Sequence, residues 1–187
     1  VKLEPITDYS KFKAQCEEIC LKYSSKDFIT TIIRPATVCG FSKRQRFDLV
    51  VNILTNLGVN TGQITVFGGK QLRPNIHIED ICDVYIHFLK NSQNINSGCF
   101  NAGFENVSIL DIAKIIKSKI PCEIEIKQSN DPRSYRQDSS KLIKTGFKPK
   151  KTISDAIDEI INAFNKGLIK DKDEWYTVRW MKLNNID

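Results

Sequence analysis

The sequence has no apolar run long enough to cross a membrane. A spanning helix needs about 20 consecutive apolar residues, whereas charged or polar residues interrupt every hydrophobic stretch here. The N-terminal segment, Val1 to Pro5, also lacks the apolar core of a signal peptide. We therefore expect no membrane partner and a cytoplasmic location.

Histidine and closely spaced cysteine are too scarce for a metal centre. Structural zinc takes four Cys or His ligands, but no CxxC occurs, and His77 and His87 lie far in sequence from the Cys16–Cys20 pair. We predict no metal site and, without a secretion signal, no disulfide framework. Because each cysteine has apolar neighbours, we expect small buried side chains at Cys16, Cys20, Cys39, Cys82, Cys99 and Cys122.

The nine glycines include no GxGxxG or GxxGxxG motif. Such a turn lets the backbone approach a pyrophosphate at the N-terminus of a helix. Gly58 and Gly62, like the adjacent Gly68 and Gly69, do not have this spacing. We therefore expect that the chain does not hold a dinucleotide firmly by itself.

The net charge of +6 favours an anionic partner only weakly. Basic clusters occur at 43–46 and 148–151, scattered among 22 acidic residues. A nucleic-acid-binding protein gathers such residues on one face, with stacking aromatics between them. We therefore expect no nucleic acid partner, and the positive charge suits a small phosphorylated substrate equally well.

The hydrophobic pattern predicts an α/β protein with a largely parallel sheet. Five segments carry apolar residues at helical spacing, namely 12–23, 47–54, 81–89, 109–116 and 153–164. Ser108 is placed to cap the fourth of these helices. Between the helices lie short β-branched or apolar runs bounded by turn residues, namely 28–33, 64–67, 75–78, 99–101 and 122–126.

Tyr9 and Lys13 form a YxxxK pair at the start of the first helix. A spacing of four residues places both side chains on one face of a helix. An ammonium about 4 Å from a phenolate stabilises it by roughly 4 kcal/mol at an effective dielectric near 20. The pair therefore suits a tyrosine that removes or returns a hydroxyl proton. Taken alone, the same spacing also fits an exposed helix start.

Four further segments follow the YxxxK segment in a recognisable order. The five are PITDYSKFKA at 5–14, IIRPATVCG at 32–40, GGKQLRPNIHIED at 68–80, FNAG at 100–103, and a closing segment from 131 to 149. Together they resemble the extended short-chain dehydrogenase/reductases, in particular the NAD-dependent epimerases and dehydratases of sugar nucleotides that are similar to UDP-glucose 4-epimerase. The resemblance extends from Pro5 to about Phe164. It implies that residues 1–187 are the C-terminal portion of such an enzyme, with the N-terminal glycine-loop half absent. The fold would be the C-terminal part of a Rossmann-type parallel sheet plus a small α/β substrate-binding domain.

The resemblance also implies roles for individual residues. Tyr9 would be the general acid/base, and Lys13 would hold the nicotinamide ribose of NAD or NADP. The residues implied to lie against the nicotinamide are Pro35, Ala36 and Thr37, and those implied for the nucleotide-sugar are Asp48, Phe67, Arg73, Arg133 and Tyr135. For Arg73 the alternative is an ion pair with Glu79 or Asp80. His77 is interpreted as a strand residue rather than a catalytic one.

Three functions follow as hypotheses. The first is an NAD(P)-dependent epimerase, dehydratase or reductase of a nucleotide-diphosphate sugar, active only in the complete protein and homodimeric through the helix Tyr9 to Tyr23. The second is a truncated or split relic that binds nucleotide-sugar without catalysis, or only associates with partner chains. The third, a basic nucleic-acid module, has little beyond its charge in its favour. The sequence departs from the family pattern at two positions. Cys39 stands where the family usually has tyrosine, and Asn75 stands where the galactose epimerases have tyrosine. The identity of the sugar therefore stays open.

Overall fold

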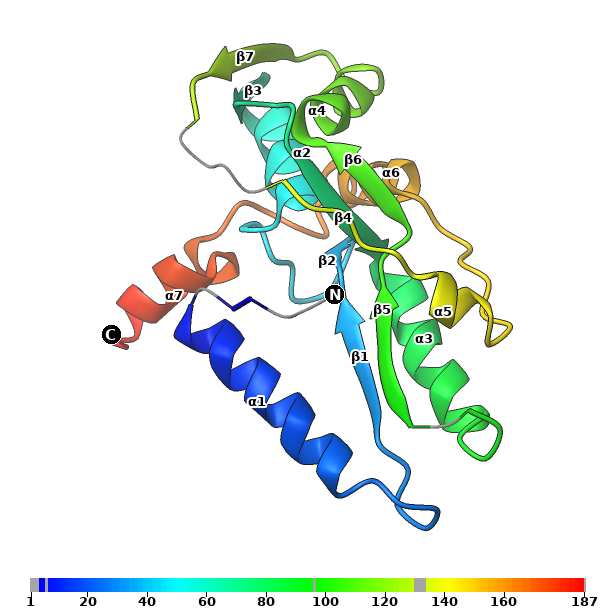
Figure 1. The fold of residues 1–187 in the computed structure, drawn as a ribbon. Coiled ribbons are helices and arrows are strands. Elements are labelled where there is room, and N and C mark those ends of the chain that lie inside the picture. The colour runs from blue at the N-terminus through cyan, green and yellow to red at the C-terminus, as the bar shows by residue number, and fades with distance from the viewer. Residues whose placement is uncertain (1–3, 6, 96, 130–133, 187) are drawn as a thin grey trace.

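The computed structural model describes residues 4–5, 7–95, 97–129 and 134–186. Its α-helices are α1 (Asp8–Lys22), α2 (Val50–Thr61), α3 (Ile78–Lys90), α4 (Ile109–Lys117), α5 (Ser140–Ile143), α6 (Ile153–Asn165) and α7 (Thr177–Leu183), with a 3-10 helix, η1 (Asp173–Trp175), before the last. Its strands are β1 (Thr31–Pro35), β2 (Thr37–Cys39), β3 (Gln63–Phe67), β4 (Leu72–His77), β5 (Gly98–Ala102), β6 (Glu105–Ser108) and β7 (Glu123–Lys127). Figure 1 shows their arrangement.

The strands of the described residues form three small sheets. β1 pairs with β5 in parallel, and β3 pairs with β7 in parallel. In the third sheet β2 pairs in parallel with β4, which pairs on its other side with antiparallel β6. Helices alternate with these mostly parallel strands, so the predicted α/β class is confirmed.

The helices begin where side chains satisfy the free N–H groups of the first turn. Thr7 and Ser10 form a capping box at the start of α1, and Thr152 and Asp155 form another at the start of α6. The Ser108 hydroxyl accepts the N–H of Asp111 at 3.1 Å, which confirms the predicted cap of α4.

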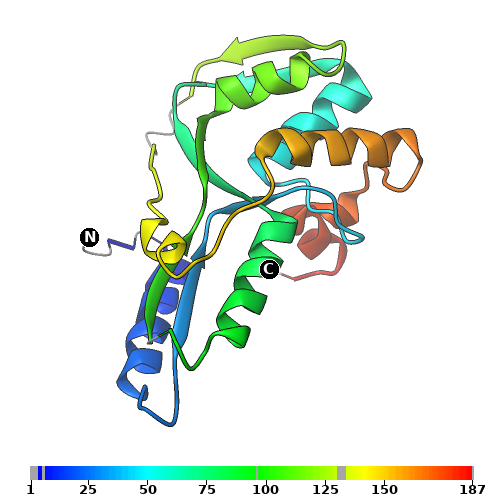
Figure 2. The ribbon, with the colours of Figure 1, turned by 90° about the vertical axis from the view of Figure 1, so that its right-hand side faces the viewer.

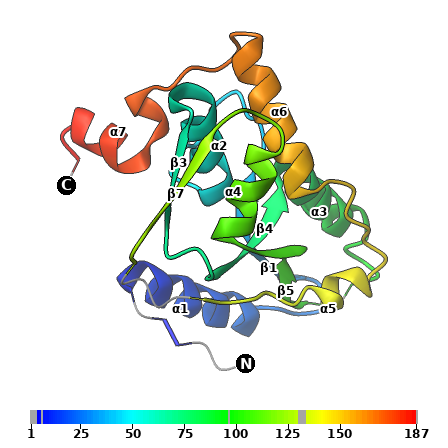
Figure 3. The same cartoon turned by 90° about the horizontal axis from the view of Figure 1, so that it is seen from above.

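Each of two apolar clusters forms the core of one part of the molecule. In the first, α2, α4 and α6 pack around β3 (Figure 3). Ile64, Ile112 and Ile157 are fully buried there. In the second, α3 runs along the β1–β5 pair (Figure 2), and Val84, Phe88 and Phe100 lie between them. The pair of strands that carries the candidate site is thus supported on the α3 side.

A third cluster joins the C-terminal segment to the loop before α2. Phe47 is completely buried among the rings of Phe164, Trp175 and Tyr176, with centroids 5.6 to 5.9 Å from its own. The backbone N–H of Phe47 donates to the carbonyl oxygen of Trp175 at 2.8 Å. The Tyr176 hydroxyl also contacts Asn56 and Asp171, both at 2.9 Å. The aromatic tail therefore packs against the domain.

Helix α1 is the least embedded helix of the core fold. It lies beside β1, on the side away from β5 (Figure 1), and none of its residues is buried. Its apolar residues Phe12, Ile19 and Tyr23 are 57–68% exposed. Among the described residues, β1 pairs only with β5, so the edge of β1 that faces α1 has no strand partner.

Burial of all six cysteines was a wrong prediction. Cys39 and Cys122 are buried and Cys99 is partly buried, but Cys16, Cys20 and Cys82 are exposed. The apolar stripe of α1 has no packing partner within the described part of the chain, and Cys82 lies on the outward face of α3. An apolar pattern identifies a helix face, but whether that face is covered depends on what packs against it.

No helix in the described ranges is both long enough and apolar enough to span a lipid bilayer.

Candidate active site

A cleft of about 530 Å³ separates α1 from the end of β1. Tyr9 and Lys13 line it from the helix, and Pro35 lines it from the strand. Three of the residues assigned to catalysis and to the nicotinamide therefore share one cavity. Tyr85 of α3 also reaches this cleft.

The position of the Tyr9–Lys13 pair follows from how α1 starts. Thr7 caps the helix, so Tyr9 falls in its first turn and Lys13 one turn further on, along the same face. The Tyr9 side chain is 76% exposed on the described surface. The phenol is thus accessible from the cleft, but no described residue closes over it.

The segment after Pro35 leads from the first sheet into the second. The N–H of Ala36 donates to the carbonyl oxygen of Ala102 at 2.8 Å, and Thr37 begins β2 opposite Asn75. The backbone of these residues is thereby fixed at the end of β1, beside the cleft. Asn75 is buried, and its Oδ1 has no hydrogen-bond partner among the described residues.

An ion pair that the sequence did not reveal spans the same cleft. Arg34 of β1 donates from Nε to Glu17 of α1 at 2.9 and 3.1 Å, and its Nη2 contacts the same carboxylate. The hydrogen bond from Arg34 holds the pKa of Glu17 below its usual value, and Lys13 contributes to that lowering. Glu17 in turn raises the pKa of Arg34, so both partners stay charged at neutral pH.

Two residues assigned to the nucleotide-sugar lie together at a second place. The guanidinium of Arg73 lies over the ring of Tyr135, 5.3 Å from its centroid. A hollow of about 410 Å³ near them is lined by the loop that follows Phe67 and by Ser134, which precedes Tyr135. Phe67 itself is 56% exposed. Arg133 lies outside the described residues.

Asp48 lies elsewhere, in the segment before α2. Its carboxylate pairs with Arg46 at 2.9 Å. Asp48 lines neither the cleft of Tyr9 nor the hollow near Arg73. Its predicted role near the nucleotide is therefore not supported by a shared cavity.

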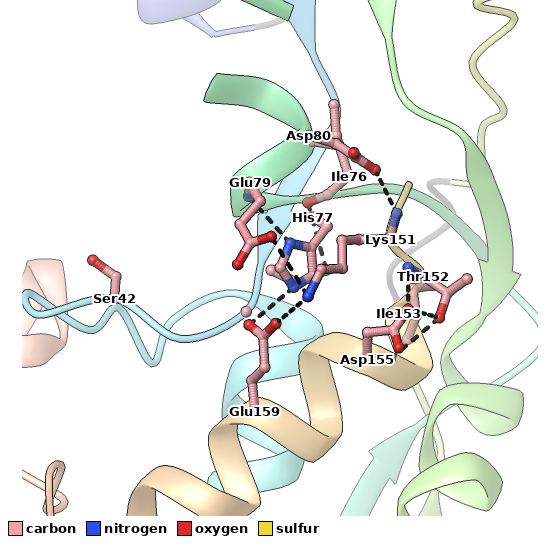
Figure 4. A network of polar contacts seen from close by, with 12 residues as sticks. Ser42, Ile76, His77, Glu79, Asp80, Lys151, Thr152, Ile153, Asp155 and Glu159 are labelled. Atoms are coloured by element: carbon pink, nitrogen blue, oxygen red, sulfur yellow. Dashed lines mark hydrogen bonds and ion pairs between the residues drawn. The ribbon is translucent and has the colours of Figure 1, made fainter. Parts of the chain in front are cut away.

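His77 is buried and belongs to a polar network that joins β4, α3 and α6 (Figure 4). Its Nδ1 accepts the backbone N–H of Glu79 at 3.1 Å, and its Nε2 is 3.0 Å from Glu159. Lys151 pairs with Glu159 at 2.9 Å and with Glu79 at 3.5 Å. Asp80 accepts the backbone N–H groups of the 150–151 turn. Glu79 and Asp80, the alternative partners considered for Arg73, thus bind other groups.

Glu105 of β6 borders this network and gives a pH-dependent prediction. Burial raises the pKa of Glu105, and Asp155 and Asp80 add to the effect, although the N–H of Ile153 opposes it at 2.5 Å. A raised pKa means that the folded state binds the proton more tightly than the unfolded state. The wild-type protein therefore loses stability as pH rises from about 4.5 through the folded pKa of Glu105.

Glu105→Gln keeps an oxygen acceptor for Ile153 and cannot ionise. In thermal unfolding across pH, we expect its Tm relative to wild type to rise between pH ~4 and pH ~7. Glu123→Gln, whose parent side chain is 83% exposed, is the control and should show no such trend. A Glu105→Gln difference that is constant across pH would contradict this account.

No group of three or more His, Cys, Asp or Glu residues that could hold a metal ion occurs within the described ranges.

A profile of the NAD dependent epimerase/dehydratase family matches residues 1–103, more than half of the chain. The chain belongs to this family. Among curated proteins, the chain is similar to the probable GDP-L-fucose synthase 1 of Oryza sativa subsp. japonica, to which it is 25% identical over 119 residues. The match covers 60% of this chain and 36% of the rice protein.

Solved structures of epimerases and dehydratases have the same fold. The UDP-glucuronic acid 4-epimerase of Bacillus cereus, solved with UDP-glucuronic acid and NAD, is 25% identical with a TM-score of 0.73 and covers 89% of this chain and 55% of that one. The dTDP-glucose 4,6-dehydratase of Bacillus anthracis, solved with NAD, is 19% identical with a TM-score of 0.75, over 95% and 56% respectively. The chain thus spans about half the length of these relatives.

The residues of the cleft would fit one end of a nicotinamide cofactor. The ammonium of Lys13 and the hydroxyl of Tyr9 are donors suited to ribose hydroxyls, and they share a cleft with Pro35. No described helix carries the glycine-rich turn that suits a pyrophosphate. Among the described residues, such a cofactor would find these contacts at its nicotinamide end.

Proposed function

We propose that this chain is the substrate-side half of an NAD(P)-dependent enzyme that epimerises, dehydrates or reduces a nucleotide-diphosphate sugar. The observation that carries the proposal is the single cleft shared by Tyr9, Lys13 and Pro35 in a chain of this family. The complete protein is then this chain together with a dinucleotide-binding half, on the same polypeptide or on a partner.

The chemistry follows from the two side chains on α1. Tyr9 takes the proton of a sugar hydroxyl, or returns it, as a general acid/base one helical turn from the ammonium of Lys13. A bound nicotinamide supplies the acceptor and donor of hydride at the sugar carbon. The exposure of Tyr9 on the described surface leaves room for both a sugar and the missing half.

The second group of residues suits the phosphates of the substrate. Arg73 has the forked guanidinium that binds phosphate oxygens in pairs. The ring of Tyr135 covers one face of the guanidinium, and this contact limits the rotation of the Arg73 side chain. The relatives solved with UDP-glucuronic acid and named for dTDP-glucose support a nucleotide-linked sugar as the substrate class.

We expect Arg73→Ala to weaken the affinity of the complete protein for its nucleotide-sugar by about tenfold or more, because a charge-assisted contact contributes about 1.5–3 kcal/mol. Calorimetric titration with UDP-, dTDP-, CDP- and GDP-sugars measures this. Lys114→Ala removes a surface cation of α4, paired only with Asp111 in the described structure, and should leave the affinity unchanged. Equal affinity in wild type and Arg73→Ala would assign Arg73 to the fold.

A homodimer through α1 is part of the same proposal. Phe12, Ile19 and Tyr23 form an exposed apolar stripe on that helix, whereas monomers usually cover such surface. Sedimentation of the complete protein should give twice the mass of one protomer, and Ile19→Glu should give protomers.

The alternative is a relic that binds nucleotide-sugar or associates with partner chains without catalysis. The lack of a glycine-rich turn favours it for the chain taken by itself. The two functions differ in one result: the relic has no turnover in any complex, whereas the enzyme turns over once the dinucleotide-binding half is present.

A further inference from the structure

Within the described residues of this chain, the helix that carries Tyr9 and Lys13 is attached to the domain by few contacts. None of its residues is buried, and its large apolar side chains are exposed. Beyond its cap, the polar contacts of α1 with the other described elements are those of Glu17 and of the carbonyl oxygen of Cys20, which accepts from Thr30 at 3.3 Å. The position of a helix in this state depends strongly on each polar contact that it makes.

Glu17 makes the strongest of these contacts. It lies one turn after Lys13 and two turns after Tyr9, on the side of α1 that lines the cleft. Arg34 donates hydrogen bonds to both of its carboxylate oxygens. The side chain of Arg34 is only 33% exposed, and that of Glu17 only 18%. The thiol of Cys99, on the adjacent strand β5, is a weaker donor to the same carboxylate at 3.8 Å.

The other partner of the pair is itself well fixed. Arg34 is paired with Asn101 in the β1–β5 register, and its carbonyl oxygen accepts from the side chain of Gln137 at 2.8 Å. Arg34 also immediately precedes Pro35, which lines the same cleft. The ion pair therefore connects a loosely held helix to a strand end that several hydrogen bonds hold in place.

We propose that the Arg34–Glu17 ion pair is the positioning contact that sets Tyr9 and Lys13 against the end of β1. The inference rests on the function proposed above. Because the forked guanidinium binds both carboxylate oxygens, the pair fixes the rotation of α1 about its axis as well as its distance from the strand. A displacement of about 1 Å at reacting groups is enough to reduce a rate about 100-fold.

The pair also sets the charge of the cleft. Lys13 and Arg34 bring two positive charges, and Glu17 neutralises Arg34 through direct contact. Lys13 is left as the cation available to the phenol and to a ribose. Loss of Glu17 would leave Arg34 as a second free cation in the cleft and would release α1 at the same time.

The test is a double-mutant cycle in the complete protein with Glu17→Gln, Arg34→Gln and the double variant. We expect each single variant to lower kcat about 10- to 100-fold with KM for the nucleotide-sugar changed less than about twofold. The double variant should be no worse than the worse single one, because one contact is lost in all three. The pH profile of kcat should also differ from wild type in each single variant, because each removes one charge from the cleft.

Two further measurements make the result decisive. In this chain by itself, hydrogen exchange of the α1 amides should become faster in Glu17→Gln, with α4 and α6 unchanged. Lys119→Gln, which breaks a 2.6 Å ion pair between the turn after α4 and Asp158 of α6, should leave kcat, its pH profile and α1 exchange as in wild type.

The outcomes separate this inference from the proposed function. If Tyr9→Phe stops turnover but Glu17→Gln leaves kcat, its pH profile and α1 exchange unchanged, the positioning role is wrong and the function stands. If the loss of kcat in the double variant equals the product of the two single losses, the positioning role is likewise wrong. If Tyr9→Phe has no effect, the proposed function itself is wrong.

Discussion

Tyr9→Phe in the complete protein is expected to lower kcat by about 10²- to 10⁴-fold, the usual range for loss of a general acid/base. Phenylalanine keeps the ring in the cleft beside Lys13 and Pro35 but has no proton to exchange. Binding of the cofactor and of the nucleotide-sugar should therefore change little. The measurement is steady-state turnover together with calorimetric affinity for both ligands.

Tyr23→Phe is the matched control, because Tyr23 lies at the other end of α1, is 68% exposed and does not line the cleft. It should leave kcat unchanged. Turnover by Tyr9→Phe within about twofold of wild type would mean that the YxxxK pair is a structural helix start, the alternative that its spacing alone allows.

Phe47→Ala is expected to destabilise the chain by about 3–5 kcal/mol, as for other buried phenylalanines. Phe47 is completely buried and touches three aromatic rings, two of them in the C-terminal tail. The cavity would both remove apolar burial and weaken the attachment of the tail. Thermal unfolding should show a Tm lower by roughly 6–20 °C for a chain of this size.

Phe28→Ala removes the same side chain from a site that is 62% exposed. Its Tm should stay within about 2 °C of wild type. Tryptophan fluorescence adds a specific readout, since Trp175 packs against Phe47 and should become more solvent-exposed in Phe47→Ala. A small Tm change with unaltered fluorescence would mean that the tail is held by other contacts.

The sequence allowed prediction of those parts of the fold that depend on local pattern. The helical stripes at 47–54, 81–89, 109–116 and 153–164 correspond to α2, α3, α4 and α6. The shared face of Tyr9 and Lys13 follows from the 3.6-residue period alone. In the same way Ser108, three residues before an aspartate, predicts the start of α4.

Short and shifted strands were predicted less well. β2 and β6 have only three and four residues and no clear alternation, so they were not anticipated. β1 begins at Thr31 and runs through Pro35, whereas the apolar run predicted residues 28–33. The pairing with β5 determines these limits, and pairing over 67 residues of sequence leaves no local signal.

In the candidate site, too, local features could be predicted from the sequence and contacts between distant residues could not. Glu17 and Arg34 are ordinary charged residues in sequence, and only their meeting across 17 positions makes them partners. A Glu on the face of Tyr9 and Lys13 was the one available signal. Asp48, by contrast, was assigned by resemblance to the nucleotide, and the structure pairs it with Arg46 instead.

The central claim is that the cleft of Tyr9 serves redox chemistry on a sugar attached to a nucleotide. Its most direct test is rapid mixing of the complete, NAD-loaded protein with UDP-, dTDP-, CDP- and GDP-sugars, followed by the near-ultraviolet absorbance of reduced nicotinamide. We predict a rise in absorbance with at least one of these sugars, absent with the same sugar lacking its nucleotide and absent in Tyr9→Phe. An unchanged absorbance with every nucleotide-sugar, together with no heat of binding for any of them, would contradict the account.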